Sequence, residues 1–292
     1  MSPISSATSA SRCRAAALPS RIVSLAASNT EILFALGAAD RLVGVSKYCD
    51  YPADALEKPR VGSFIDADYV AIRRVDPDLV LTESHLQREI VAQLIDLNIN
   101  VLSLNPVTLA GVLDSISLIG KIVGCEAQAD VLVAQMQGRI GAVQTQGTAL
   151  TRRPRVYFEE WGNPMIPAGG WEAECVEVAG GINVFPFPAH VHSRERTISS
   201  EDVIHTNPDM IVVSWPGSFG RILPHKIKQR EGWEKIEAVR NDRVFVIDDR
   251  LIVRPGPRIV EGLELVAGLI CRFAAEEPSA AGLSRKSDNR VF

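Results

Sequence analysis

Histidine and carboxylate side chains gather in a Pro-rich loop, PFPAHVHSRE, at residues 186–195. His190, His192 and Glu195 lie there, and His85 follows a predicted strand in the other half of the chain. Imidazole and carboxylate groups are ligands that zinc and manganese accept in proteins. The spacing also arises by chance in flexible loops. The alternative is that these histidines are solvated or face a ligand, and we expect no resident metal.

Glu159 and Glu160 form a second candidate, as paired carboxylates for acid–base catalysis. They are adjacent in a predicted strand, where successive side chains point to opposite faces, so they cannot act on one substrate. The sequence also lacks the GxSxG, P-loop, strand-following GxGxxG and HExxH signatures. We therefore expect a protein that is not an enzyme and has no intrinsic cofactor.

Aromatic side chains follow predicted strands in both halves of the chain. In open parallel sheets, ligands bind beyond the carboxyl ends of the strands. Aromatic rings gathered there suit a large planar or partly apolar ligand, although a single ring at such a place is more often packing than a ligand contact. Trp233 differs, because it lies in a predicted amphipathic helix and is expected in the core. The predicted ligand-binding aromatics are Tyr48, Phe64, Trp161, Trp171 and Trp215.

Arg254 lies in the segment LIVRPGPR, between the last predicted strand and the last helix. Pro255 and Pro257 stiffen this loop, so the guanidinium is held in place and can bind a carboxylate, amide or phosphate of a ligand. The alternative is a structural salt bridge. Arg258, at the start of the helix, is expected to be structural.

The elements that must position these side chains alternate between strand and helix. In the first half, extended runs at 21–26, 42–46, 60–64, 78–82 and 100–104 alternate with turns and helical segments. Ser28 and Glu31 have the spacing of a capping box at a helix start. The same alternation recurs from 155–161 to a terminal helix at 258–273. Connections this short favour parallel sheets with helices on both faces.

A long helix is predicted between the two halves, at 125–147. With ~1.5 Å of rise per residue it runs about 30 Å, enough to cross from one small domain to another. Gly138 and Gly141 each cost about 1 kcal/mol relative to Ala there. Apolar residues recur along it at steps of three and four and form one stripe: Ala129, Leu132, Met136, Ile140 and Val143.

The predicted fold class is α/β, with two lobes, each a mostly parallel sheet flanked by helices, joined by one long helix. The lobes are assigned to 21–124 and 151–275 and the linking helix to 125–150, while 1–20 and 276–292 are predicted to be disordered extensions. An internal match supports two similar lobes: VAIRRVDPDLVL from Val70 and EDVIHTNPDMIVV from Glu201 both place a Pro-Asp turn between a short helix and a strand.

Composition bounds the class of protein. The 292 residues carry a net charge of -4, which provides no basic field for nucleic acid, and no run of 18 apolar residues predicts a membrane span. The five cysteines include no CxxC pair; Cys175 and Cys271 could meet, but free thiols are the expectation. Residues 1–20 lack the uninterrupted apolar core of a secretory signal and resemble a transit peptide only in composition.

Several motifs in order resemble one family: NTEILFALG, VGVSKYCDYP, DPDLVLT, VAGGINVF, NPDMIVVSW and RPGPRIVEGL. Together they resemble the substrate-binding proteins of ABC importers for cobalamin, haem and iron-siderophores, most closely the cobalamin-binding branch. The resemblance covers residues 21–273. It implies two lobes joined by a long helix, a cleft that changes little on binding, a monomer and no catalysis.

The resemblance also implies roles for particular residues. Tyr48, Phe64 and Arg254 match places where cobalamin-binding members contact the corrinoid, and Trp161 and Trp215 lie near such places. Relatives dock on the membrane permease with one glutamate in each lobe; here Glu201 fills the second position, whereas Val70 stands at the first, with Asp68 close by as a substitute.

We therefore expect a non-catalytic protein that binds a cobalamin-like corrinoid between two lobes, for ABC-type uptake or intracellular handling. A haem or ferric-siderophore binder, a zinc or manganese binder using His85, His190 and His192, and an enzyme of cobamide metabolism are the alternatives. The resemblance implies a location outside the cytoplasm, and the composition of residues 1–20 a cytoplasmic one.

Overall fold

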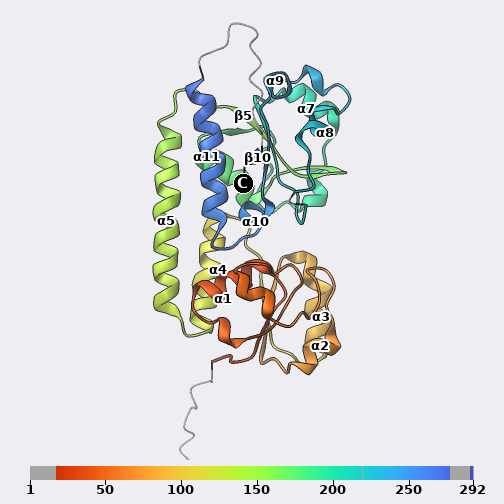
Figure 1. Cartoon of the computed structure of the whole chain (residues 1–292), viewed down its shortest axis with the longest axis vertical. Coiled ribbons are helices and arrows are strands. Elements are labelled where there is room, and N and C mark those ends of the chain that lie inside the picture. Colours follow the sequence, from red (N-terminus) through yellow and green to blue (C-terminus); the bar gives the residue numbers. More distant parts are fainter. Residues whose placement is uncertain (1–17, 219, 277–289, 292) are drawn as a thin grey trace, which may run out of the picture.

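The computed structural model describes residues 18–218, 220–276 and 290–291. The chain forms two α/β lobes stacked along its long axis, with the helix α5 (Glu126–Thr148) running beside both (Figure 1). The predicted fold class is confirmed. Residues 1–17 and 277–289, and with them Cys13 and most of the two predicted extensions, lie outside the described part. Across the residues described, no helix is both long and apolar enough to cross a membrane.

The N-terminal lobe is a parallel four-stranded sheet in the order β2-β1-β3-β4. Alternate residues of each strand pack on opposite faces: Ile22 and Leu81 lie in the core cluster that holds α1 and α4, whereas Val23 and Val80 face α2 and α3. The strands are β1 Ile22–Ser24, β2 Leu42–Val45, β3 Leu79–Glu83 and β4 Val101–Leu104, and the helices are α1 Ala27–Ala35, α2 Tyr69–Arg74, α3 Arg88–Asp96 and α4 Leu109–Ile122.

The C-terminal lobe holds a six-stranded sheet in the order β10-β9-β8-β5-β6, with β7 also paired to β5. All its pairs are parallel except β5 with β6. Its strands are β5 Arg155–Gly162, β6 Met165–Pro167, β7 Ile182–Asn183, β8 Met210–Val213, β9 Val244–Ile247 and β10 Arg290–Val291, and its helices are α6 Gly170–Val178, α7 Ser200–Thr206, α8 Pro224–Lys228, α9 Glu237–Arg240, α10 Asp249–Ile252 and α11 Ile259–Ala275.

Helix α5 is unbroken and buries the predicted stripe. Ala129, Met136 and Val143 are buried, and Leu132 and Ile140 pack partly buried against the same core cluster. Gly138 and Gly141 lie on the open side, where an added methyl group would meet nothing within 4 Å. The helix contacts α4 of one lobe and α11 of the other, so one continuous hydrophobic core joins both lobes (Figure 1).

The two Pro-Asp turns have the same local structure in both lobes. Asp76 and Asn207, which precede the prolines, have left-handed backbones with φ of 44° and 40°. The carboxylate of Asp78 accepts hydrogen bonds from the backbone N–H of Ser20 and Arg21, and that of Asp209 accepts one from the N–H that leads into β5. In both lobes the turn thus ties the start of the first strand to the start of its parallel neighbour, as the internal match predicts.

Some sequence predictions of local structure are wrong. Residues 60–64 form only isolated bridges, at Arg60 and Gly62, in place of a strand. The segment 233–239 is a 3-10 turn (Trp233–Lys235) followed by α9, although Trp233 is fully buried as expected. Residues 290–291, assigned to the tail, add β10 to the edge of the sheet, because the exposed edge of β9 offers backbone partners to any extended segment.

The capping box at Ser28 and Glu31 is also wrong. Helix α1 begins at Ala27 without a side-chain cap, and both residues lie buried inside it. Their side chains bond instead to Glu83 and to Arg258 of the other lobe, so neither side chain caps the helix.

Two glycines of α5 test this packing. Gly138→Ala should raise the free energy of unfolding by roughly 0.5–1 kcal/mol, because the methyl group meets nothing and restricts the unfolded chain. Gly147→Ala should lower it by about 1–3 kcal/mol, because its Cβ would lie 2.6 Å from the carbonyl oxygen of Val178. Urea denaturation of both variants provides the measurement. Equal effects would contradict the close packing of the end of α5 on the C-terminal lobe.

Candidate functional site

A cavity of about 460 Å³ opens between the lobes. This volume lies within the range of small-molecule sites. Leu86, which follows β3, contributes the wall from the N-terminal lobe. The C-terminal lobe contributes the other residues of the lining: Glu160, Trp161, Pro164, Ile166, Ser193, Arg194, Thr197 and Pro216.

Trp161 lines this cavity and forms an aromatic pair with Trp215. Their ring centroids are 6.3 Å apart with an interplanar angle of 50°. Trp161 is 39% exposed, and its Nε1 donates to the carbonyl oxygen of Asn163 at 2.9 Å. The pair offers an apolar surface to a ligand, because the polar edges of both indoles are already bonded to the protein.

Glu159 holds Trp215 in place from beneath. It is fully buried and accepts hydrogen bonds from Nε1 of Trp215 at 3.1 Å, from Arg230 at 2.5 and 2.8 Å, and from the Tyr157 hydroxyl at 2.9 Å. Burial, and next the charge of Glu159, raise the pKa of Tyr157 well above its usual value, so the phenol stays a donor. Both carboxylate oxygens of Glu159 thus accept hydrogen bonds within the protein, and the bond to Nε1 fixes the indole ring of Trp215.

Glu160 points to the opposite face, as expected for adjacent strand residues. It bonds Arg196 at 2.8 Å, and the buried Arg196 also donates to the carbonyl oxygens of Pro167 and Val191. Burial raises the pKa of Glu160, although the charge of Arg196 opposes the rise. The pKa of Glu172 lies well above its usual value, mainly because of burial and next because of the charge of Glu160. The predicted separation of the two glutamates is confirmed.

His85 and His192 meet between the lobes. Their ring centroids are 4.0 Å apart. His190 does not join them in a metal site: within the described ranges, no three His, Cys, Asp or Glu side chains are placed to hold an ion. The geometry of the described residues therefore does not support the alternative of a zinc or manganese site built from His85, His190 and His192.

Arg254 joins an ion-pair cluster between the lobes. Its Nη1 lies 2.6 Å from Asp50 Oδ1 and 3.3 Å from Glu31 Oε1, while Arg258 bonds both oxygens of Glu31 at 2.8 and 2.7 Å. Burial would raise the pKa of Asp50, but the hydrogen bond and charge of Arg254 outweigh it and hold that pKa low. The geometry thus supports the structural alternative for Arg254, and Arg258 is structural as expected.

Glu83, at the carboxyl end of β3, extends this buried network. It accepts a hydrogen bond from the Ser28 hydroxyl. Burial raises its pKa to about 7, against the hydrogen bond from Ser28 and the charge of Arg254, while the charge of Glu31 adds to the rise. Burial thus favours the protonated form of this carboxyl, although Arg254 of the cluster favours the ionised form.

The other predicted ligand residues lie in different surroundings. Tyr48 follows β2 and is 44% exposed, with the Lys47 amine 5.1 Å from its ring centroid. Phe64 is half-buried in the bend that replaces the predicted strand, and its carbonyl oxygen accepts from Gln87. Trp171 packs against the core, with Nε1 donating to Ile252. The structure therefore brings Trp161 and Trp215 together and keeps Trp171 apart from them.

The predicted docking residues lie at the starts of equivalent helices, α2 and α7, but not at equivalent positions. Glu201 lies exposed in the first turn of α7. Asp68 precedes α2, where its carboxylate accepts a hydrogen bond from the N–H of Ala71 at 2.9 Å. Val70, which stands where Glu201 stands in the other lobe, is 70% exposed.

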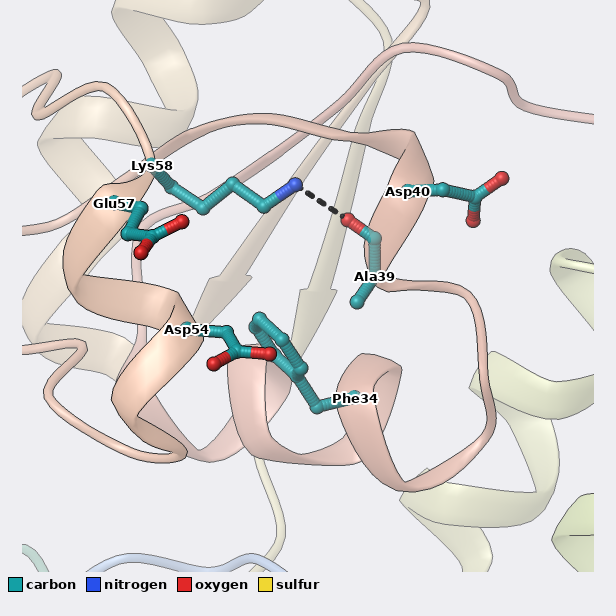
Figure 2. A pocket seen from close by; sticks show the side chains of 6 residues that line it. All are labelled: Phe34, Ala39, Asp40, Asp54, Glu57 and Lys58. Carbon is teal, nitrogen blue, oxygen red and sulfur yellow. Dashed lines mark hydrogen bonds between the residues drawn. The ribbon is translucent and has the colours of Figure 1, made fainter.

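A separate hollow of about 370 Å³ lies within the N-terminal lobe. Figure 2 shows the Phe34 side chain in it, near Asp54, with Nζ of Lys58 donating to the carbonyl oxygen of Ala39 at 2.8 Å. Its other lining residues are Asp40 and Glu57. No residue of the C-terminal lobe lines it, so it is distinct from the cavity between the lobes.

Comparisons with known proteins identify the family. The family model described as periplasmic binding protein matches residues 22–251. The chain belongs to the periplasmic binding protein family. The fold of the family, two lobes with a site between them, is the one seen here, and its members bind substrates without catalysis, so the expectation of a non-enzyme is confirmed.

The relatives include proteins described as binding different substrates. An uncharacterised ABC transporter substrate-binding lipoprotein, YvrC of Bacillus subtilis, is 31% identical over 85% of this chain and 79% of its own. The structure of the periplasmic vitamin B12-binding protein BtuF of Vibrio cholerae matches with a TM-score of 0.73 and 26% identity, over 89% of this chain and 99% of its own. The haem-binding protein RhuT of Roseiflexus sp. RS-1 matches with a TM-score of 0.76 and 25% identity, over 87% and 98%.

The buried ion pairs predict that two arginine variants differ in how much stability they lose. Arg258→Ala should lower the free energy of unfolding by about 3 kcal/mol or more, because it leaves the buried Glu31 carboxylate with only the longer bond to Arg254. Arg139→Ala, which removes a two-bond pair with Glu264 whose side chains are both 43% exposed, should cost at most about 1 kcal/mol. Chemical denaturation measures both. Similar losses would contradict the dominance of the inter-lobe cluster.

Glu83 predicts a pH dependence of stability. Because its pKa rises from 4.5 in the unfolded chain to about 7, the folded state holds a proton that the unfolded state releases, and stability falls as pH rises through this window. Glu83→Gln should remove this cost, so that its stability relative to the parent increases by up to about 3 kcal/mol between pH 4 and pH 8. The exposed Glu89→Gln variant is the control. A constant difference across the range would refute the raised pKa.

Proposed function

We propose that this protein binds a cobalamin-like corrinoid between its lobes and delivers it to an ABC importer. The observation that carries the proposal is Trp161, which lines the inter-lobe cavity and pairs with the ring of Trp215. A corrinoid has a broad planar ring edged with neutral amides, and indole faces bind such rings by dispersion and stacking. The vitamin B12-binding protein among the relatives supports the same substrate class.

Charge in the cavity is consistent with this ligand. Glu160 is neutralised by Arg196, so a neutral ligand meets no unpaired carboxylate there. Arg194 also lines the cavity and provides a donor for amide oxygens. Haem is the second candidate, favoured by the haem-binding relative and by the ability of the same arginine to pair with a propionate.

Further contacts complete the proposed site. Tyr48 and Phe64 would contact the ligand from the N-terminal lobe, while Arg254 holds the lobes together through Glu31 and Asp50. Trp171 would act indirectly, by tying helix α6 to the carbonyl oxygen of Ile252.

Delivery requires a membrane permease. We propose that it docks on the lobe surfaces around Glu201 and Asp68. Asp68 also caps α2, so its carboxylate is only partly available, and the exposed Val70 beside it would add an apolar contact. The protein would then work outside the cytoplasm, as the periplasmic and lipoprotein relatives are described.

Fluorescence titration tests the substrate. Cobalamin and cobinamide should quench the tryptophan emission of the purified protein at micromolar concentrations, because the ring lies against Trp161 and Trp215. Trp161→Ala should weaken binding by roughly tenfold, the loss of one aromatic contact of about 1.4 kcal/mol. Trp233→Phe, in the core of the C-terminal lobe, should leave the affinity unchanged.

Three outcomes decide between the candidates. Quenching by corrinoids but not by haem supports the proposal. Tight binding of haem alone would replace the corrinoid with haem as the substrate. Absence of quenching by either compound would overturn the assignment of the cavity as a tetrapyrrole site.

A further inference from the structure

The contact between His85 and His192 joins the two lobes beside the cavity. Their rings lie 4.0 Å apart, although 107 positions separate them in the chain. The residue after each histidine, Leu86 and Ser193, lines the cavity, so the pair lies next to it in both lobes. A ligand between the lobes would therefore come close to the two imidazoles.

Both histidines stand on short irregular segments. His85 begins a 3-10 turn (His85–Gln87) after Ser84, whose backbone has a positive φ of 70°. His192 immediately precedes another 3-10 turn (Ser193–Arg196). Side chains on such segments can part to admit a ligand without moving the sheets, whereas the shared core holds the lobes.

The imidazole nitrogens are available for coordination. Among the described residues, no hydrogen bond joins either imidazole to another side chain. Burial lowers the pKa of His85, and the charges of His192, Arg88 and Arg194 lower it further, so the ring is neutral at neutral pH. A neutral imidazole with an unshared nitrogen is the form that binds transition metals.

Two imidazoles are too few to hold a free metal ion firmly. Structural zinc sites have four protein ligands and catalytic sites three, and the described residues supply no third side chain. The pair instead fits a metal that arrives with most of its coordination sphere filled. Such a metal is held by a macrocycle and leaves only an axial position open to the protein.

We propose that His85 and His192 form an imidazole site for the metal centre of a macrocyclic ligand with an exchangeable axial position. This inference rests on the proposed function and restricts the ligand to macrocycles whose metal has an exchangeable axial position. On binding, a nitrogen lone pair of one imidazole replaces an axial water, which leaves as water, and no electron or proton is transferred. Cobalt in a corrinoid and iron in a porphyrin share this chemistry.

Two cobinamides allow coordination of the metal by histidine to be measured separately from binding of the ring in the cavity. Diaquacobinamide carries exchangeable axial waters, whereas in dicyanocobinamide cyanide blocks both axial positions. The protein should shift the visible absorbance bands of diaquacobinamide and leave those of dicyanocobinamide unchanged. It should also bind diaquacobinamide at least tenfold more tightly by tryptophan quenching. The same measurement with ferric haem tells whether iron is accepted as well as cobalt.

Histidine variants assign the ligand. Combining His85→Ala with His192→Ala should abolish the spectral shift and the preference for diaquacobinamide, while quenching persists. The single variants identify the coordinating ring. His190→Ala, in the same loop, and His205→Ala, in α7, should behave as the parent protein. Circular dichroism confirms that each variant is folded.

Each result has a distinct meaning. Quenching by diaquacobinamide without a spectral shift, or a shift that survives in the double variant, would overturn the coordination while leaving the proposed function intact. A protein that binds Ni²⁺ through the two histidines but affects no tetrapyrrole spectrum would also overturn it. Absence of quenching by every tetrapyrrole would instead refute the proposed function.

Discussion

The buried contact of Glu31 with Arg258 and Arg254 is the interaction on which the arrangement of the two lobes depends. Glu31 lies in α1 of the N-terminal lobe, its side chain only 2% exposed, and both arginines come from the loop before α11 in the other lobe. A carboxylate removed from water must be paired, so the lobes cannot separate here without exposing or stranding a charge. Asp50 and Glu83 extend the same cluster and make it a shared property of both lobes.

A continuous hydrophobic core adds a second constraint. Helix α5 contacts α4 of one lobe and α11 of the other, and Glu174 of α6 accepts a hydrogen bond from the first turn of α4 at 2.7 Å. The long helix is therefore one of several connections. With the sheets held in this way, adaptation to a ligand falls to the segments that follow the strands, where the paired indoles and imidazoles lie.

The buried carboxylates of the strands hold other side chains in position. Glu159 fixes the indole of Trp215 and the guanidinium of Arg230, Glu160 pairs with Arg196, and Glu83 is bonded to Ser28. Each is buried or nearly so and is already bonded to other groups of the protein. This agrees with a family whose members bind without catalysis, and the groups that we propose to meet the ligand are aromatic faces and imidazole nitrogens.

The sequence by itself determined the two lobes, their parallel sheets and the long helix, because these follow from periodicity and from short turns that act locally. It also placed Trp161 near the end of one strand and Trp215 just after another. Only the tertiary structure decided which partners meet: Ser28 and Glu31 have the spacing of a cap, yet they bond to Glu83 and Arg258. The tertiary structure likewise decided that Arg254 pairs with Asp50 and that His85 meets His192. Such pairs join residues far apart in the chain, and no local pattern encodes the approach of two lobes.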